Sequence, residues 1–421
     1  MPIVKLVAEG IGPFDRLELD LSDGNGNPHL GPHILAGVNG SGKSTILRTI
    51  GWLLDPGNRG FNSAEWEHFT TGQSARAIAT FPGSDGLYAI ASNPGSKWSW
   101  SETVDRGVDL LIRGSDAARE FNIAGYTPSK ALRYIEQPSL TATLTNPDHN
   151  ALSFEATIQN DAIQAWLLGL YSKRAIANEK RQPTQQYTLS LERFESALKL
   201  LYDEEVKFDV EIEPNFQPRL RVAGQNLNFS QMPDGIRGTV GWIADFMMRQ
   251  DRVNRGKNLG DKRPGILLLD EVDAHLHPLW QRKLLPAVRK ALPDVQIVVT
   301  SHSPFVISSC PGSRVHVLEV DAKGRAHNRP PVDSPVGESV MTTLKEIFGV
   351  DSRFDIQTEA ELNEWNALKK LEATGKLKQE QRQRLLALTK ELAERSEELR
   401  ALVAGPMSVP KSVLEALLAE V

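Results

Sequence analysis

Apolar residues follow two different spacings along the chain, and together they predict an α/β protein. Short strands are predicted over residues 3–7 and 33–36, on either side of the turn-rich sequence LSDGNGNPHLG. A helix is predicted from Lys43 to about Leu54. Strand patterns return over 207–300, where VKFDVEI, RLRVAG, GILLLDE and QIVVTSH occur in turn. We expect these two α/β halves to build one core.

Two other patterns interrupt this core. Residues 74–102 contain ARAIATF, GLYAIAS and KWSW, separated by Gly, Pro, Ser and Asp, which predicts short antiparallel strands that form a β-lobe. Residues 151–205 show helical spacing, so we expect a helical insertion there. The apolar positions with this spacing are Ile163, Trp166, Leu167, Leu170, Leu191, Phe194, Leu198 and Leu201.

Residues 335–421 are predicted to form a helical domain appended to the core. Leucines and one tryptophan recur on both sides of Gly375, which predicts a helical hairpin. Gly-Pro at 405–406 ends this pattern, and a last amphipathic helix is predicted over 413–421. It either packs on its own hairpin or, with the rest of 357–421, forms a docking surface for another protein. The hairpin positions are Leu362, Trp365, Leu368, Leu371, Leu385, Leu388, Leu392, Leu399 and Leu402.

Composition narrows the class of protein. The 421 residues are enough for two or three domains, and 40% hydrophobic with 24% charged residues is ordinary for a soluble protein. No apolar run reaches the roughly 20 residues that cross a bilayer, and the N-terminus does not resemble a signal peptide. The single cysteine, Cys310, has no partner for an internal disulfide, so a buried thiol and a cytoplasmic location are expected.

The formal net charge of −5 argues against a general electrostatic attraction to nucleic acid. Two local basic clusters remain, within residues 173–181 and 249–263. Each is either a nucleic-acid contact or, as is more common for charge runs, a solvated helix end or loop. Their members are Lys173, Arg174, Lys180, Arg181, Arg249, Arg252, Arg255, Lys257, Lys262 and Arg263.

The sequence GVNGSGKS at 37–44 matches the phosphate-binding motif G-x-x-x-x-G-K-[ST] and lies between the strand HILA and a helix. Glycines let backbone N–H groups surround a phosphate, and the helix N-terminus adds partial positive charge. Lys43 would reach the β- and γ-phosphates of ATP, and the Ser44 hydroxyl would bind Mg²⁺. The predicted nucleotide contacts are Asn39, Gly40, Ser41, Gly42, Lys43, Ser44 and Thr45.

Two later strands end in further candidate residues. GILLLDE places Asp270 and Glu271 at the end of an apolar strand, which is a Walker B pattern. Asp270 is predicted to hold Mg²⁺, and Glu271 to polarise the attacking water. QIVVTSH then delivers His302 at the end of the next strand. Alone, each of these two segments would be interpreted as an ordinary buried strand. Because both follow a phosphate-binding loop in this order, catalytic roles for their terminal polar residues are favoured.

The order of these motifs resembles the stand-alone ABC-type ATPases related to RecF and the OLD proteins, and most closely the ATPases of Septu and retron anti-phage systems. The resemblance covers about residues 1–320 and includes DEVDAHLHPLWQRKLLP and VVTSHSPFVISS. It implies an ABC-type ATPase head whose N-terminal half is 1–150 and whose C-terminal half is 206–334. It also implies that His302 is the switch histidine, which contacts the γ-phosphate.

The resemblance further implies that residues 232–235, Met-Pro-Asp-Gly, form a signature loop that reaches the ATP of a second subunit. Pro233 stands where a serine usually offers its hydroxyl and backbone N–H to the γ-phosphate. Asp234 and Gly235 remain as predicted contacts, so ATP-driven dimerisation should survive this change better than fast hydrolysis does. We therefore expect a head-to-tail homodimer or a higher oligomer, with slow turnover.

Other loop residues carry weaker signals. The resemblance places His275 and His277 in the D-loop, and their i, i+2 spacing makes a metal site less favourable than a structural role. Gln137, in RYIEQPS, is the candidate Q-loop glutamine, with an ordinary surface loop as the equal alternative.

Two functions remain open at this stage. In the first, the chain is the ATPase subunit of an anti-phage defence complex and controls a separate effector, such as an HNH-type nuclease. In the second, it is a RecF-like repair ATPase that binds duplex DNA directly. No sustained heptads occur between Ile50 and Ser230, which argues against an SMC protein. The tail has few paired acids and no histidine beyond His327, so any nuclease would be a separate polypeptide.

Overall fold

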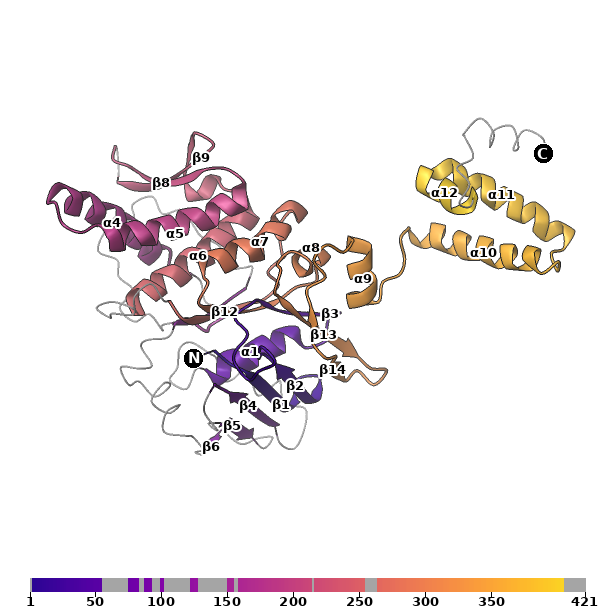
Figure 1. Cartoon of the computed structure of the whole chain (residues 1–421), viewed down its shortest axis with the longest axis horizontal. Helices are drawn as coiled ribbons and strands as arrows, with labels where there is room; N and C mark the ends of the chain where they lie inside the picture. The colour runs from indigo at the N-terminus through magenta and orange to yellow at the C-terminus, as the bar shows by residue number, and fades with distance from the viewer. Residues whose placement is uncertain are drawn as a thin grey trace. The chain divides into compact units, whose positions relative to one another are not determined.

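The computed structural model divides the chain into two compact units, Met1–Phe348 and Gly349–Val421 (Figure 1). The described residues are 2–54, 75–82, 87–92, 99–101, 122–127, 150–154, 158–213, 216–253 and 263–404. The predicted helical domain began at residue 335, whereas the C-terminal unit of the structure begins at Gly349. Helix α9 (Val340–Phe348) therefore belongs to the first unit.

An antiparallel sheet forms one layer of the N-terminal unit, with the strand order β2-β1-β4-β5-β6. Its strands are β1 (Lys5–Ile11), β2 (Phe14–Asp20), β4 (Ala75–Thr80), β5 (Leu87–Ser92) and β6 (Ser99–Ser101). The last three confirm the predicted β-lobe. β2 was missed: its sequence FDRLELD is rich in charge, yet Leu17 and Leu19 alternate with exposed Arg16 and Glu18, as a half-buried strand requires.

A mostly parallel sheet forms the centre of the unit, in the order β14-β13-β3-β12-β11-β7, with β15 also paired to β13. The strands β7, β11, β12, β3 and β13 are parallel to their neighbours in this run. Their bounds are β3 (His33–Gly37), β7 (Asn122–Tyr126), β11 (Gly265–Leu269), β12 (Val295–Thr300), β13 (Arg314–Val320), β14 (Ala326–Asn328) and β15 (Val332–Asp333). Parallel strands end at the same edge, so the loops after β3, β7, β11 and β12 meet there.

Helices and strands cover both faces of the central sheet (Figure 1). On one face, α1 (Lys43–Leu53) lies between the central sheet and the antiparallel sheet, and its apolar side chains join both. On the other face lie the helices α4 (Asn160–Glu179), α5 (Gln185–Tyr202), α6 (Asp234–Val253) and α7 (Pro278–Ala291), which share a second core with the sheet. Burial on both faces explains why β3, β11 and β12 consist of buried residues throughout.

The remaining elements of the first unit complete this second face. The predicted helical insertion is confirmed as α4 (Asn160–Glu179) and α5 (Gln185–Tyr202). A small antiparallel sheet, ordered β10-β9-β8, follows it. The bounds are β8 (Val206–Glu211), β9 (Gln217–Val222), β10 (Gln225–Leu227), α6 (Asp234–Val253), α7 (Pro278–Ala291) and α8 (Pro304–Ile307).

The basic clusters do not form one exposed face. Arg249 is only 3% exposed and is paired with Asp245 inside the core, so this member of the second cluster cannot reach nucleic acid. Lys180 and Arg181 are exposed at the end of α4, as a solvated helix end would be. Arg255, Lys257 and Lys262 lie outside the described residues. Cys310 is buried, and none of the described helices is long and apolar enough to span a membrane.

The C-terminal unit contains the predicted helical hairpin, α10 (Ile356–Ala373) and α11 (Gln379–Arg395), followed by α12 (Glu397–Ala404). Most predicted hairpin leucines are buried, but Leu402 is 43% exposed and Val403 is buried instead. The reason is Ser396, whose extended backbone ends α11 and shifts the helical phase of α12. The predicted helix over 413–421 lies outside the described residues.

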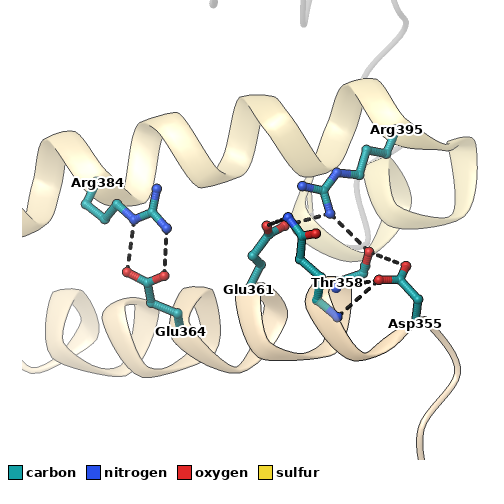
Figure 2. A network of polar contacts seen from close by, with 7 residues as sticks. Asp355, Thr358, Glu361, Glu364, Arg384 and Arg395 are labelled. Carbon is teal, nitrogen blue, oxygen red and sulfur yellow. Dashed lines mark hydrogen bonds and ion pairs between the residues drawn. The ribbon is translucent and has the colours of Figure 1, made fainter.

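Polar contacts tie the two hairpin helices together (Figure 2). Arg384 donates two hydrogen bonds to Glu364, at 3.0 and 2.8 Å, and Arg395 pairs with Glu361 at 2.6 Å. Asp355 caps α10 by accepting from two backbone N–H groups and from the Thr358 hydroxyl. Because the Arg384–Glu364 pair is about half exposed, it fixes the pairing of the helices more than it stabilises them.

A buried histidine pair joins β3 to β13 in the first unit. His33 Nδ1 lies 3.0 Å from His316 Nε2, and His33 Nε2 lies 3.2 Å from the His29 carbonyl oxygen. A carbonyl only accepts, so His33 carries its proton on Nε2 and His316 donates to Nδ1. This assignment applies to neutral rings, the form that burial favours. Burial lowers the pKa of His316 to about 4 and the pKa of His33 well below its usual value.

We expect the first unit to lose stability as the pH falls from about 6.5 toward 4. The unfolded chain takes up protons on His33 and His316 near pH 6.5, whereas the folded unit keeps them neutral, so acid favours unfolding. Each histidine lowers the free energy of unfolding by up to about 1.4 kcal/mol per pH unit in this window. Thermal unfolding between pH 7.5 and 5.5 measures the slope. His316→Gln should reduce this slope, and a flat profile in the wild type contradicts this account.

Candidate functional site

The loop between β3 and α1 has a backbone that only glycine allows. Gly37, Gly40 and Gly42 have positive φ angles of 153°, 80° and 88°. A Cβ at Gly42 would lie 2.5 Å from the ring of Phe14, and one at Gly37 would lie 2.4 Å from a backbone oxygen. α1 begins directly after this loop, so the first N–H groups of the helix point toward it. The loop thus has the form of an anion-binding cradle.

Lys43 is held at the centre of this cradle. Its Nζ donates to the carbonyl oxygens of Gly37 and Val38, at 3.0 and 2.9 Å, and the residue is only 6% exposed. Burial lowers the pKa of Lys43, while the carboxylates of Asp270 and Glu271 act in the opposite direction. The ammonium group therefore contacts the loop directly and interacts electrostatically with the acids at the end of β11.

A chain of hydrogen bonds joins these acids to three other elements. The Ser44 hydroxyl donates to Asp270 Oδ1 at 2.9 Å, which links α1 to β11. The Thr300 hydroxyl, at the end of β12, donates to the same oxygen at 2.7 Å and accepts from the Glu271 N–H at 2.6 Å. The Asp270 N–H donates to the Tyr126 carbonyl of β7 at 2.9 Å. The parallel strand ends thus meet as the topology requires.

A cavity of about 370 Å³ opens at this edge of the sheet. Its volume lies within the range of small-molecule sites. It brings the phosphate-binding loop together with Glu271 and His302. Burial, and then the nearby Lys43 charge, lower the pKa of His302, so its ring is mainly neutral at pH 7. The lining residues are Pro13, Asn39, Gly40, Gly42, Lys43, Ser44, Thr45, Glu271 and His302.

The residues predicted for the signature loop lie elsewhere. Asp234 and Gly235 begin α6, and Gly235 does not line the cavity of the phosphate-binding loop. Gly235 lines a second, smaller cavity together with Tyr126, Trp242 and His275. A Cβ on Gly235 would lie 2.2 Å from the His275 carbonyl oxygen, so the start of α6 packs closely on the loop that contains His275, which is the D-loop predicted from the sequence.

Other predicted loop residues have structural positions. His277 caps α7, and its Nδ1 accepts from the Leu279 N–H at 3.3 Å. His275 has a positive φ of 62° in the loop before it. Ser41, a residue of the phosphate-binding loop, is fully buried. Gln137 lies outside the described residues.

Several residues of the site were missed from sequence. Gln281, on α7, donates to the D-loop carbonyls of Asp273 and Leu276, at 3.1 and 2.9 Å, and accepts from the Ser303 hydroxyl at 2.6 Å. It therefore connects the D-loop to the residue after His302. Thr300 had a recognisable signal, because it is the polar residue that follows the apolar run of residues 297–299 at the end of its strand.

Tyr126 had no such signal, since β7 was not predicted. Its hydroxyl donates to Asp245 Oδ2 at 2.6 Å, and Arg249 Nε donates to the same oxygen at 2.7 Å. All three side chains are buried, and burial followed by the Asp245 charge raises the pKa of Tyr126 well above its usual value. This group attaches α6 to the strand whose carbonyl holds Asp270.

Comparison with known proteins supports the resemblance seen in the sequence. A family model described as "AAA domain, putative AbiEii toxin, Type IV TA system" matches residues 117–308. Septu protein PtuA of Bacillus thuringiensis is 24% identical over 392 residues, which cover 89% of this chain and 93% of PtuA. Retron Ec83 probable ATPase of Escherichia coli is 32% identical over 101 residues, which cover 24% of this chain and 19% of that protein.

Among solved structures, the SMC head domain from Thermotoga maritima aligns with a TM-score of 0.44 and 16% identity, covering 78% of this chain and 99% of that one. The parallel sheet, the phosphate-binding loop before α1 and the acids after β11 make the fold an α/β P-loop ATPase head of the ABC type, as predicted.

Proposed function

We propose that this chain, a homologue of Septu protein PtuA and of retron ATPases, binds and hydrolyses ATP as a head-to-tail homodimer and so controls a separate effector, such as an HNH-type nuclease, in anti-phage defence. The observation that carries the proposal is the cavity in which the phosphate-binding loop, Glu271 and His302 converge. A loop of this form next to two acids suits phosphoryl transfer to water.

The loop would hold the phosphates of ATP. Its backbone N–H groups, those of the first turn of α1 and the Lys43 ammonium present positive charge from several sides. The contacts we assign to the nucleotide are Asn39, Gly40, Gly42, Lys43, Ser44 and Thr45, which line the cavity, whereas the predicted contact Ser41 is fully buried and does not line it.

Ser44 and Asp270 would hold Mg²⁺. Their oxygens lie 2.9 Å apart in a contact between a hydroxyl and a carboxylate, and such a donor set suits a hard divalent cation. The ion would neutralise charge on the phosphates during transfer.

Glu271 and His302 would act on the reacting groups. The Glu271 carboxylate is exposed to the cavity, so it would orient a water molecule and accept its proton. The neutral His302 ring would donate a hydrogen bond to the γ-phosphate. Because Pro233 offers neither a hydroxyl nor an N–H group, we expect hydrolysis to be slow.

Asp234 and Gly235 would complete the site of a second chain. They start a 20-residue helix whose N-terminal dipole favours anions, and Gly235 does not line the nucleotide cavity of its own chain. A head-to-tail dimer uses both halves. The alternative function, direct binding to duplex DNA, would not use Arg249, which is buried in an ion pair.

Mixing two inactive variants should restore activity if the sites are composite. In a heterodimer of Lys43→Ala and Asp234→Ala chains, one site has both defects and the other has none. Random pairing at equal amounts should therefore recover about a quarter of wild-type ATP hydrolysis. The matched control mixes Lys43→Ala with the double variant, which leaves every site defective. No recovery in the first mixture, or full activity of either variant alone, would refute the composite site.

A further inference from the structure

We propose that Thr300 is the positioning residue for both Walker B carboxylates, an inference that rests on the ATPase function proposed above. Its side chain is fully buried at the end of β12, and its hydroxyl makes two short hydrogen bonds. The Glu271 N–H can only donate, at 2.6 Å, so the hydroxyl proton goes to Asp270 Oδ1 at 2.7 Å. The Thr300 hydroxyl therefore contacts both Asp270 and Glu271.

The first consequence concerns the backbone of Glu271. Its φ is +46°, a left-handed conformation that non-glycine residues rarely adopt and that must be held by the surroundings. Thr300 holds it twice, because its hydroxyl accepts from the Glu271 N–H and its carbonyl accepts from the Val272 N–H at 3.1 Å. This turn places Glu271 at the cavity wall, next to the phosphate-binding loop.

The second consequence concerns Asp270. Its Oδ1 accepts hydrogen bonds from Ser44 on α1 and from Thr300 at the end of β12. Thr300 keeps the carboxylate turned toward Ser44 even when the Ser44 hydroxyl engages another group. A buried carboxylate without this second donor would be free to rotate, and its affinity for a divalent cation would fall.

A simple packing role makes a different prediction. The residues before Thr300 are buried Val298 and Val299, and valine has nearly the same shape as threonine. Thr300→Val therefore preserves packing and removes the hydroxyl, whereas Thr300→Ser keeps the hydroxyl and removes a methyl group.

The test compares the full-length wild type with these two variants. Calorimetry gives the affinity for ATP in EDTA and the Mg²⁺ concentration that half-saturates the Mg²⁺-dependent gain in affinity; steady-state kinetics give kcat and KM, and melting gives Tm. For Thr300→Val we expect ATP affinity in EDTA within about twofold of wild type, half-saturating Mg²⁺ raised about 10-fold or more, and kcat lowered about 10–100-fold at similar KM. Thr300→Ser should stay within about threefold of wild type in all of these.

Two results would overturn the inference while leaving the ATPase function intact. One is a Thr300→Val variant with wild-type Mg²⁺ dependence and kcat. The other is equal impairment of both variants together with a lowered Tm, which would assign Thr300 to packing. A wild type that binds no ATP under any condition refutes the proposed function itself, and the inference falls with it.

Discussion

Glu271→Gln should leave ATP binding within about threefold of wild type and lower hydrolysis by about 100-fold or more. Glutamine keeps the size of the side chain and the left-handed backbone contact to Thr300, so the cavity should keep its form. It cannot accept a proton from water, and it loses the charge that orients the water. Calorimetry and single-turnover hydrolysis measure the two quantities separately.

Exposed Glu338→Gln is the matched control, because it makes the same change of charge at a residue that does not line the cavity. It should leave both quantities unchanged. The Glu271→Gln variant should also accumulate as a dimer in the presence of ATP, since the nucleotide is bound and not consumed. Hydrolysis at the wild-type rate would remove Glu271 from the proposed chemistry.

Lys43→Ala should weaken ATP binding by about 100-fold or more. The ammonium group is buried between the phosphate-binding loop and the Walker B acids, where a charge interacts strongly because little water screens it. Its loss removes the positive charge at the cradle and leaves the Asp270 and Glu271 carboxylates to repel the phosphates. Calorimetric titration with ATP and Mg²⁺ measures the effect.

The control for this change is Lys290→Ala, on the exposed side of α7, which removes the same side chain without touching the cavity. It should bind ATP as the wild type does. Both variants should retain the wild-type Tm within a few degrees, because Lys290 is exposed and the side-chain hydrogen bonds of Lys43 go only to two carbonyls of the neighbouring loop. Equal ATP affinity for wild type and Lys43→Ala would show that the phosphate-binding loop does not bind the nucleotide.

The sequence was sufficient to predict the elements that carry the site. Phosphate-binding loops need a fixed glycine spacing between a strand and a helix. The loop at residues 37–44 can therefore be recognised from the local sequence alone, without knowledge of its tertiary contacts. Asp270 and His302 could be assigned to the same edge because each ends an apolar strand, and parallel strands end together.

What the sequence could not give is the register between strands. Thr300 reaches Asp270 because Leu269 lies opposite Val299 in the parallel pair β11 and β12; a shift of one residue would turn the hydroxyl to the other face. The Tyr126 contacts depend in addition on β7, whose five residues NIAGY show no alternation. In the same way, the break at Ser396 changed which residue of α12 is buried.

The account is tested most directly by a structure of the Glu271→Gln variant determined with ATP and Mg²⁺. We expect the nucleotide phosphates in the loop of residues 37–44 of one chain, with the N-terminus of α6 of a second chain facing the γ-phosphate and the cation beside Ser44 and Asp270. A nucleotide bound elsewhere, or a loop filled by ATP in a chain that no second copy approaches through α6, would contradict the composite ATPase site.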